Sequence, residues 1–386
     1  PLEMAPSPVL LRPYQQECID KLVAYRRRPA KGGIGSRALV GIATGGGKTI
    51  IFAHLPRFAR GRTLVIAHRE ELLDQAAGHL ARINPGKRVG VEQASRHAGS
   101  ADIVVASIQT LSADDGRRLR QLTPSDFSLV ITDEAHHSTA RTYVQALHHF
   151  GLAPDVSDLN DGDLGRRKLT QEVKDRFTNF KPTDLAFLAG FTATPHRTDG
   201  QGLEAIFDEI VYSATIENMI RGGWLCPVRG KFVYTGTDIS GVKTRMGDFA
   251  EGMLSQEVNT PERNKLAVAA YLDHAAGRQA LIFCVDVEHA HDMAQVWNQA
   301  GVPTGVVTGK TPRDERHGVI AAYKAGEIRA LANCMVLTEG FDAPETSCVV
   351  MARPTKSGLL YTQMLGRGTR IAPGKSDLLV LDLVDL

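Results

Sequence analysis

The stretch that decides the fold is residues 38–49, which read Ala-Leu-Val-Gly-Ile-Ala-Thr-Gly-Gly-Gly-Lys-Thr. Its apolar first half predicts a buried strand, and its glycines stand where that strand ends and a helix begins. Backbone N–H groups of such a turn wrap an anion, and the helix N-terminus adds positive potential. Lys48 would reach the β- and γ-phosphates of a nucleotide, and the Thr49 hydroxyl would ligate Mg²⁺. The segment therefore predicts a phosphate cradle formed by Thr44, Gly45, Gly46, Gly47 and Lys48.

This turn departs from the strict G-x-x-x-x-G-K-[ST] pattern, because Ile42 occupies the position of the first glycine. The alternative is a glycine-rich turn with an incidental lysine. The strand before the turn and the helix after it favour the phosphate cradle.

A second set of polar residues follows the apolar run 129–132, in the order Asp133, Glu134, Ala135, His136, His137. A carboxylate that leaves a buried strand beside a phosphate loop can hold Mg²⁺ through water. We assign Asp133 to the metal, and Glu134 as the base that orients and deprotonates the attacking water. Alone, such a pair is usually a solvated loop. The His pair lacks a third ligand at the spacing that zinc requires, so no zinc site is predicted.

Short apolar runs followed by turn residues and helical patterns recur along the chain, which predicts an α/β fold with parallel sheets. A length of 386 residues suits two or three folded units, and we expect two doubly wound domains. The predicted strands are 38–43, 63–68, 102–107, 129–133 and 185–192 in the first half, and 280–285, 303–307, 330–335, 347–351 and 378–383 in the second.

Two segments break this rhythm. Residues 224–260 are rich in glycine and polar side chains, which places the domain junction near Cys226 and gives domains 1–226 and 227–386. Residues 152–183 are acidic first and basic afterwards, and we expect them to be an exposed, irregular insertion with little to bury.

Composition excludes several classes of protein. Apolar residues make up 43% and charged residues 23%, as in ordinary globular domains. The net charge is only +2, so a surface for nucleic acid would need local clusters of basic residues. Five cysteines without a C-x-x-C pair predict free thiols in a reducing compartment. No apolar run approaches the length of a membrane span, so we expect an intracellular protein without membrane contact.

The motifs together resemble superfamily 2 nucleic-acid-dependent ATPases of the DEAH-box kind, within them the XPB-like and RadD-like repair helicases and the related branched-DNA helicases of fungal mitochondria. The resemblance covers nearly the whole chain. Its motifs occur in order: Leu11–Gln15 for adenine recognition, then motifs I at Ala43–Thr49, Ia at Ile66–Leu72, Ib at Ala106–Thr110, II at Asp133–His136, III at Thr192–Thr194, IV at Leu281–Cys284, V at Thr338–Asp342 and VI at Gln363–Arg370.

The resemblance implies tandem RecA-like domains that face an ATP cleft, with ATP and Mg²⁺ as cofactors. It also implies roles for single residues. Beyond the cradle these are Arg12, Gln15, Gly340, Asp342 and Gln363 for the nucleotide, Arg367 and Arg370 for the γ-phosphate, His136, Thr192 and Thr194 for coupling, and Arg69, Gln109, Thr110 and Thr338 for the nucleic-acid strand. Each of the last four could instead be a helix cap or turn residue.

The spacing of motif VI adds a structural expectation. Gln363, Gly366, Arg367 and Arg370 recur every three or four residues, so on a helix they would share one face, turned toward a nucleotide. The alternative is a basic surface helix.

The function implied is an ATP-dependent helicase or translocase that acts on DNA in repair or recombination without reading sequence. The alternatives are an RNA helicase, a duplex translocase that separates no strands, and, in other classes, a P-loop kinase or transferase, or a binding scaffold without hydrolysis. A scaffold would be expected to lack Glu134 or Arg370. The bacterial cytoplasm is the expected compartment, and the mitochondrial matrix is the alternative if a targeting segment has been removed.

Overall fold

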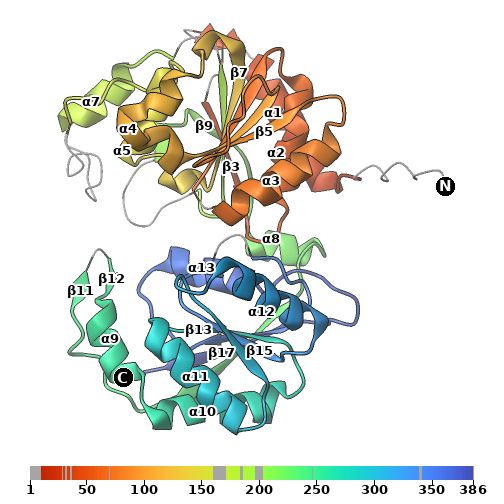
Figure 1. Ribbon diagram of the computed structural model, residues 1–386, viewed down its shortest axis with the longest axis vertical. Coiled ribbons are helices and arrows are strands. Elements are labelled where there is room, and N and C mark those ends of the chain that lie inside the picture. The colour runs from red at the N-terminus through yellow and green to blue at the C-terminus, as the bar shows by residue number, and fades with distance from the viewer. Residues whose placement is uncertain are drawn as a thin grey trace, which may run out of the picture. The chain divides into compact units, whose positions relative to one another are not determined.

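The computed structural model describes residues 10–27, 29–30, 33–34, 37–68, 70–159, 171–182, 186–195, 203–245, 247–338 and 341–385. The chain divides into two units between Thr215 and Ile216, except that Thr44–Gly46 are grouped with the second unit (Figure 1). This division lies close to the junction expected near Cys226.

The first unit contains a seven-stranded sheet in the order β5-β6-β4-β7-β8-β3-β9. All neighbouring strands in it are parallel. The strands are β3 (Arg37–Ile42), β4 (Arg62–Ala67), β5 (Val89–Glu92), β6 (Ile103–Ser107), β7 (Phe127–Asp133), β8 (Phe187–Thr192) and β9 (Glu209–Ala214). A separate antiparallel pair joins β1 (Pro29–Ala30) to β2 (Gly33–Ile34).

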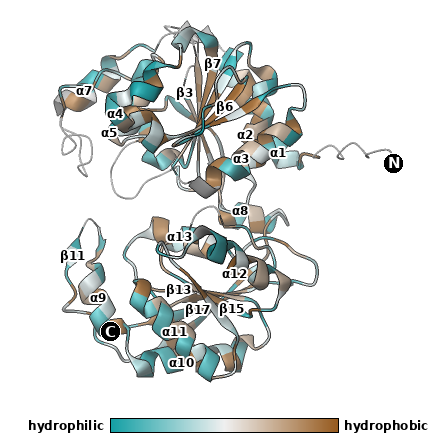
Figure 2. Cartoon of the chain, viewed as in Figure 1, coloured by the Kyte–Doolittle hydropathy of each residue, from teal (hydrophilic) through white to brown (hydrophobic). Residues whose placement is uncertain are grey.

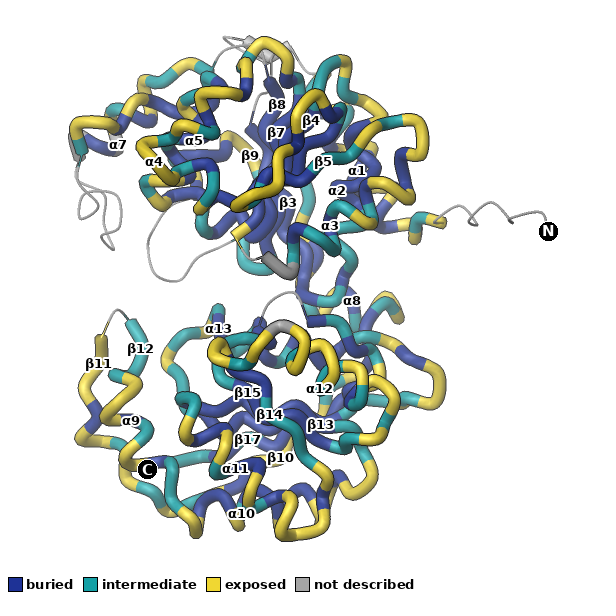
Figure 3. Tube along the Cα trace, in the orientation of Figure 1, coloured by how far each residue is buried: buried dark blue, intermediate teal, exposed yellow. Residues whose placement is uncertain are grey.

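Helices cover both faces of this sheet. The helices α1 (Pro13–Arg27), α2 (Lys48–His54) and α3 (Glu70–Ile83) pack in sequence on one face. The helices α4 (Ile108–Arg120) and α5 (Arg141–His149) pack on the other (Figure 1). The central strands are hydrophobic and buried (Figures 2 and 3). Burial on both faces explains why these strands read as continuous apolar runs.

The segment 152–183 corrects an expectation. Its described parts are not an exposed excursion: Leu152, Ala153 and Val156 are buried in the first unit's core. Val173 and Phe177, one turn apart on helix α7 (Gln171–Asn179), are buried in the same core. The charge blocks hid these apolar residues, which are few but occupy one face of the helix.

The second unit contains a six-stranded sheet in the order β10-β17-β16-β13-β15-β14, again entirely parallel. Its strands are β10 (Val228–Tyr234), β13 (Ala280–Phe283), β14 (Thr304–Val307), β15 (Ala330–Asn333), β16 (Cys348–Met351) and β17 (Leu378–Val384). A small hairpin is formed by β11 (Thr244–Arg245) and β12 (Asp248–Phe249).

Helices of the second unit form two further cores against this sheet. On one face Trp297 and Tyr271, from α11 (Val287–Gln299) and α10 (Pro261–Ala275), are buried. On the other face Tyr323 and Met364, from α12 (Arg313–Ala325) and α13 (Gly358–Gly366), are buried. The remaining helices are α8 (Ile216–Arg221) and α9 (Glu251–Val258), and the described chain also holds short 3₁₀ turns at Leu55–Phe58, Pro124–Asp126, Ala135–His137 and Leu203–Ala205.

The strands expected from the sequence are all present, with ends that differ by at most two residues. Those that sequence reasoning missed include β5, β9 and β10, and each lies at an edge of its sheet. Edge strands carry mixed polar and apolar residues, because only part of their surface is covered. The five cysteines are free and at least half buried, as expected. Among the described helices, none combines the length and apolar character needed to cross a bilayer.

Candidate nucleotide and nucleic-acid site

The turn between β3 and α2 has the geometry of a phosphate cradle. Gly45 and Gly47 have φ of 86° and 73°, a left-handed conformation that disfavours side chains. A Cβ atom on Gly47 would lie 2.7 Å from Nε2 of Gln15, so glycine lets that amide lie against the turn. Gln15 is held in turn by Arg12, whose backbone N–H donates to Oε1 at 2.9 Å. The start of α1 is thereby brought to the cradle, as the resemblance implied.

Lys48 and Glu134 meet at the carboxyl edge of the first sheet. Their strands, β3 and β7, flank β8 and run parallel, so both turns leave the sheet on the same side. The Lys48 Nζ atom lies 2.8 Å from Oε1 of Glu134, and both side chains are largely buried. Glu134 itself has φ of 48°, which is uncommon for a residue with a side chain. A strained residue directly after a buried strand is typical of a functional site.

The charge state of Glu134 follows from its neighbours. Burial would raise the pKa of this carboxyl, but the Lys48 ammonium and then His136 outweigh it and hold the pKa below its usual range. Glu134 is therefore a carboxylate at neutral pH and can accept a hydrogen bond from water.

A chain of polar contacts joins this carboxylate to motif III. Oε2 of Glu134 lies 3.4 Å from Nδ1 of His136. The same nitrogen lies 3.4 Å from the Thr192 hydroxyl, which accepts a hydrogen bond from the backbone N–H of Thr194 at 3.2 Å. His136 and Thr192 are fully buried. The three residues expected to couple nucleotide and strand are thus connected to the expected base.

Two oxygen donors in this unit suit Mg²⁺. Asp133 ends β7 and is buried, with Oδ1 accepting from the backbone N–H of Glu134 at 3.0 Å. Thr49 is half buried in the first turn of α2, which follows β3. Carboxylate and hydroxyl oxygens are ligands that Mg²⁺ binds together with phosphate oxygens and water. These residues fit the ion that the sequence implies.

Motifs Ia and Ib are linked by Gln109, whose Nε2 donates to the His68 carbonyl at 2.8 Å. The ring of His68 stacks on His137 with centroids 4.8 Å apart, which connects this surface to motif II. Gln109 is exposed, whereas the Thr110 hydroxyl accepts from the backbone N–H of Ala94 at 3.1 Å. Arg69 lies outside the described residues.

Motif VI differs from its expected shape. Helix α13 ends at Gly366, so Gln363 is helical, Arg367 is the C-cap residue and Arg370 lies beyond the helix. The expectation of one shared helical face is therefore wrong. Directly after the helix the chain passes close to the sheet at Gly368, where a Cβ atom would lie 2.4 Å from Cδ1 of Leu378.

Both arginines are instead anchored to motif V. Arg367 is buried and donates from Nη1 to the Phe341 carbonyl at 2.9 Å. Arg370 forms an ion pair with Asp342, the residue that follows Phe341. Motifs V and VI are thus a single structure in this unit, although the sequence separates them. Gly340 lies outside the described residues.

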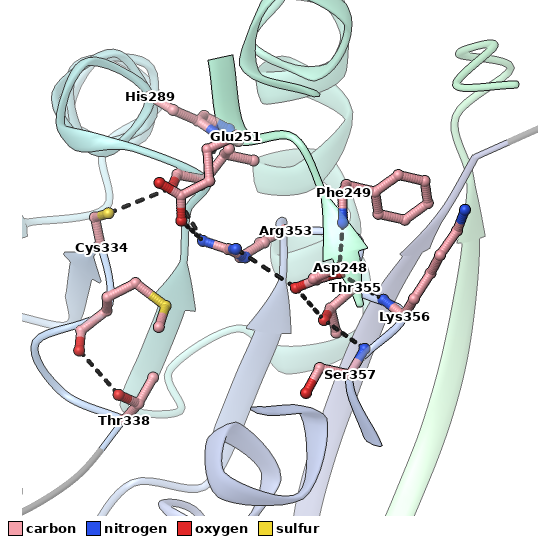
Figure 4. A network of polar contacts seen from close by, with 12 residues as sticks. Asp248, Phe249, Glu251, His289, Cys334, Thr338, Arg353, Thr355, Lys356 and Ser357 are labelled. Carbon is pink, nitrogen blue, oxygen red and sulfur yellow. Dashed lines mark hydrogen bonds and ion pairs between the residues drawn. The ribbon is translucent and has the colours of Figure 1, made fainter. Parts of the chain in front are cut away.

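A polar network surrounds the carboxyl edge of the second sheet (Figure 4). Its centre is Arg353, which is buried. Nη1 of Arg353 lies 3.0 Å from Oε1 of Glu251, and Nη2 lies 3.6 Å from Oδ2 of Asp248. Asp248 also accepts hydrogen bonds of 2.8 Å from the Thr355 hydroxyl and the backbone N–H of Lys356 (Figure 4). This network fixes the β11–β12 hairpin against the segment that follows β16.

Thr338 lies near this network and is buried, and its hydroxyl donates to the Met335 carbonyl at 2.9 Å (Figure 4). That bond is the turn role that the sequence left open for Thr338.

Sequence reasoning missed His68, Arg353 and Lys375 as organising residues. His68 was visible within motif Ia, directly before Arg69. Arg353 follows β16, so the rule that functional residues stand after parallel strands would have found it. Lys375 follows a Pro-Gly pair and shows no periodic relation to the motif before it.

Comparisons with known proteins match each half of the chain to a protein family. Residues 9–197 match the family described as "Type III restriction enzyme, res subunit", and residues 263–372 match "Helicase conserved C-terminal domain". The chain belongs to the superfamily 2 helicases.

Two fungal proteins are similar to nearly the whole chain. It is 34% identical over 393 residues to "Putative ATP-dependent helicase IRC3" of Saccharomyces cerevisiae, covering 98% of this chain and 52% of that protein. It is 32% identical over 387 residues to "Putative mitochondrial ATP-dependent helicase irc3" of Schizosaccharomyces pombe, covering 97% and 57%. The chain thus spans little more than half the length of these relatives.

A solved structure supports the fold of this helicase. A fragment of a putative HsdR subunit of a type I restriction enzyme from Vibrio vulnificus YJ016 matches with a TM-score of 0.68 and 22% identity, covering 96% of this chain and 63% of that one. This likeness confirms the tandem RecA-like α/β domains expected from the sequence.

Proposed function

We propose that this helicase hydrolyses ATP with Mg²⁺ and uses the energy to move along a nucleic-acid strand. The observation that carries the proposal is the Lys48–Glu134–His136–Thr192 chain of contacts, which joins the phosphate cradle to motif III through buried side chains. A phosphotransferase has no need for such a connection, nor for an arginine pair anchored to motif V.

The residues would divide the chemistry as follows. Lys48 binds the β- and γ-phosphates, and Thr49 and Asp133 hold Mg²⁺, which neutralises phosphate charge. Glu134 orients the attacking water, and Arg367 and Arg370 stabilise charge on the transferring phosphoryl group.

The pairing of Lys48 with Glu134 has a chemical consequence. When Lys48 turns to a phosphate, Glu134 loses the contact that outweighs its burial, so its pKa rises. The carboxylate then becomes a stronger proton acceptor at the moment when the nucleotide is bound.

The test of this assignment is Glu134→Gln. This variant should bind a fluorescent ATP analogue as the parent does but turn over ATP about 10²-fold or more slowly. Turnover at the parent rate would show that another group activates the water. Lys21→Ala, which alters an exposed residue on α1, is the control and should behave as the parent does.

We further propose DNA as the track, in repair or recombination. The support is the resemblance to XPB-like and RadD-like helicases, including the DEAH sequence at 133–136, and the match to a restriction-enzyme subunit family. Strand displacement and ATP turnover on single-stranded, duplex and branched DNA, beside matched RNA, decide between DNA and RNA. ATP turnover on duplex without displacement would identify a translocase that separates no strands.

Of the two expected compartments, the mitochondrial matrix gains support from the name of the S. pombe relative.

A further inference from the structure

Lys375 is a lysine placed inside the loop that carries the motif VI arginines. Its ammonium donates three hydrogen bonds, to the carbonyls of Pro344 at 3.1 Å, Gly368 at 2.6 Å and Arg370 at 2.7 Å. An ammonium has three N–H donors, so each of them has an acceptor here.

Together with one backbone hydrogen bond, these bonds hold the continuous backbone segment 368–370. Between the Gly368 and Arg370 carbonyls, the Thr369 carbonyl accepts from the backbone N–H of Cys226 at 2.8 Å. The three consecutive carbonyls of Gly368, Thr369 and Arg370 therefore all accept hydrogen bonds, from Lys375 and from the backbone of Cys226. Since α13 has already ended, no helical hydrogen bonds could hold them.

Lys375 also closes a link between motifs V and VI. Arg367 bonds to the Phe341 carbonyl, Arg370 pairs with Asp342, and Lys375 reaches the Pro344 carbonyl. All three links end on residues 341–344. Of the three, only the lysine link joins the backbones of motifs V and VI without using an arginine side chain.

We propose that Lys375 is a positioning residue for ATP hydrolysis, because its ammonium fixes the backbone from which Arg367 and Arg370 project. This inference rests on the proposed function, in which those arginines stabilise phosphoryl transfer. Lys375 itself touches no reacting atom; it acts through the loop.

The charge of Lys375 matters to this role. A neutral amine has one N–H fewer and a lone pair that would face a carbonyl oxygen, so at least one bond is lost on deprotonation. Burial lowers the pKa of Lys375 to about 8. Of the groups that face it, Cys226 and Glu345 act to raise this pKa, whereas Arg370 and Arg278 act to lower it. The ammonium is therefore present at neutral pH and is lost as the pH rises above about 8.

The experiment measures steady-state ATP turnover with saturating single-stranded DNA from about pH 6.5 to about pH 9.5. Lys375→Met should lower kcat about ten-fold or more at neutral pH, with the KM for ATP changed less than about two-fold, because misplaced arginines affect the transition state more than binding. The kcat of the parent should fall above about pH 8, where Lys375 loses its charge. Lys375→Arg keeps its charge throughout this range, so its kcat should lie near that of the parent at neutral pH and should not fall at higher pH. Lys324→Met, at an exposed lysine of α12, is the matched control and should follow the parent.

The outcomes separate this inference from the proposed function. Parent-like kcat in Lys375→Met, together with loss of turnover in Arg370→Ala, overturns the role of Lys375 and leaves the proposed function intact. Parent-like turnover in Arg370→Ala overturns the function assigned to the loop itself. If Lys375→Met does not fold, as judged by circular dichroism, the pH profiles of the parent and Lys375→Arg decide: an equal alkaline fall in both overturns the inference.

Discussion

The two units hold their proposed catalytic groups in different ways. In the first unit the groups stand at the ends of buried parallel strands and contact one another through side chains, from Lys48 to Glu134 and His136. In the second unit Arg367 and Arg370 stand on a loop after a helix, where the Phe341 carbonyl, the Asp342 carboxylate and the Lys375 ammonium hold them. The strand ends of the sheet therefore position the groups of the first site, whereas contacts between the loop and other segments of the chain position those of the second.

This comparison predicts its largest effect at Lys48. Lys48→Ala removes the only side-chain cation of the phosphate cradle, so ATP turnover should fall by more than about 10³-fold. Turnover of radiolabelled ATP measures it. If Lys48→Ala keeps even a tenth of the parent rate, the first unit is not organised around phosphate in the way described.

The second unit gives the next prediction. Arg370→Ala should lower kcat about 10³-fold and leave the affinity for a nucleotide analogue largely unchanged, because its charge is needed in the transition state. Asp342→Asn, which keeps the arginine but removes the carboxylate that orients it, should lower kcat less. The reverse order of these two variants would contradict the assignment of Arg370 to phosphoryl transfer.

Sequence patterns predicted the first unit more completely than the second, and the reason is physical. Strand ends are fixed by the period of apolar residues, so Lys48, Asp133 and Glu134 could be placed at one edge before any coordinates were known. The end of α13 could not be placed, because the chain turns where Gly368 passes close to Leu378, a residue ten positions later. No local pattern contains that contact.

The burial of segment 152–183 could not be predicted for a related reason. Its charged residues outnumber the apolar ones in sequence, although Val173 and Phe177 form one buried face of α7. Long-range packing, rather than local composition, decides whether such a segment is buried.

A stability measurement sharpens this point. Phe177→Ala should lower the free energy of unfolding of the first unit by about 3–5 kcal/mol, as expected when a buried aromatic ring is removed. Asn179→Ala, at an exposed position of the same helix, is the control. Urea denaturation followed by circular dichroism measures both, and equal stability of the two variants would restore the view of an exposed insertion.

The smallest predicted effect concerns pH. In the parent, the folded pKa of Glu134 lies below its unfolded value, so this group stabilises the fold above the unfolded pKa and loses that contribution as the pH falls. In Lys48→Ala the burial that raises the pKa of Glu134 is no longer outweighed by lysine. The variant should therefore be less stable than the parent at pH 7.5, with a gap that narrows as the pH approaches about 5 and Glu134 takes up a proton.

Thermal unfolding at several pH values measures this gap. The double variant Lys48→Ala/Glu134→Gln removes the unpaired carboxylate, so its difference from the parent should be nearly independent of pH in this range. A gap in Lys48→Ala that widens on acidification would mean that the two side chains do not share a buried ion pair in solution.

If ATP hydrolysis in this helicase is coupled to a nucleic-acid strand, its rate must depend on DNA. The initial rate of ATP hydrolysis is measured with increasing concentrations of unstructured single-stranded DNA, at fixed salt and saturating ATP. We expect a saturable rise of about ten-fold or more over the rate without DNA, with the half-saturating DNA concentration increasing as salt is added, because phosphate contacts release counterions. A turnover rate that stays the same with single-stranded DNA, duplex DNA and RNA would contradict it.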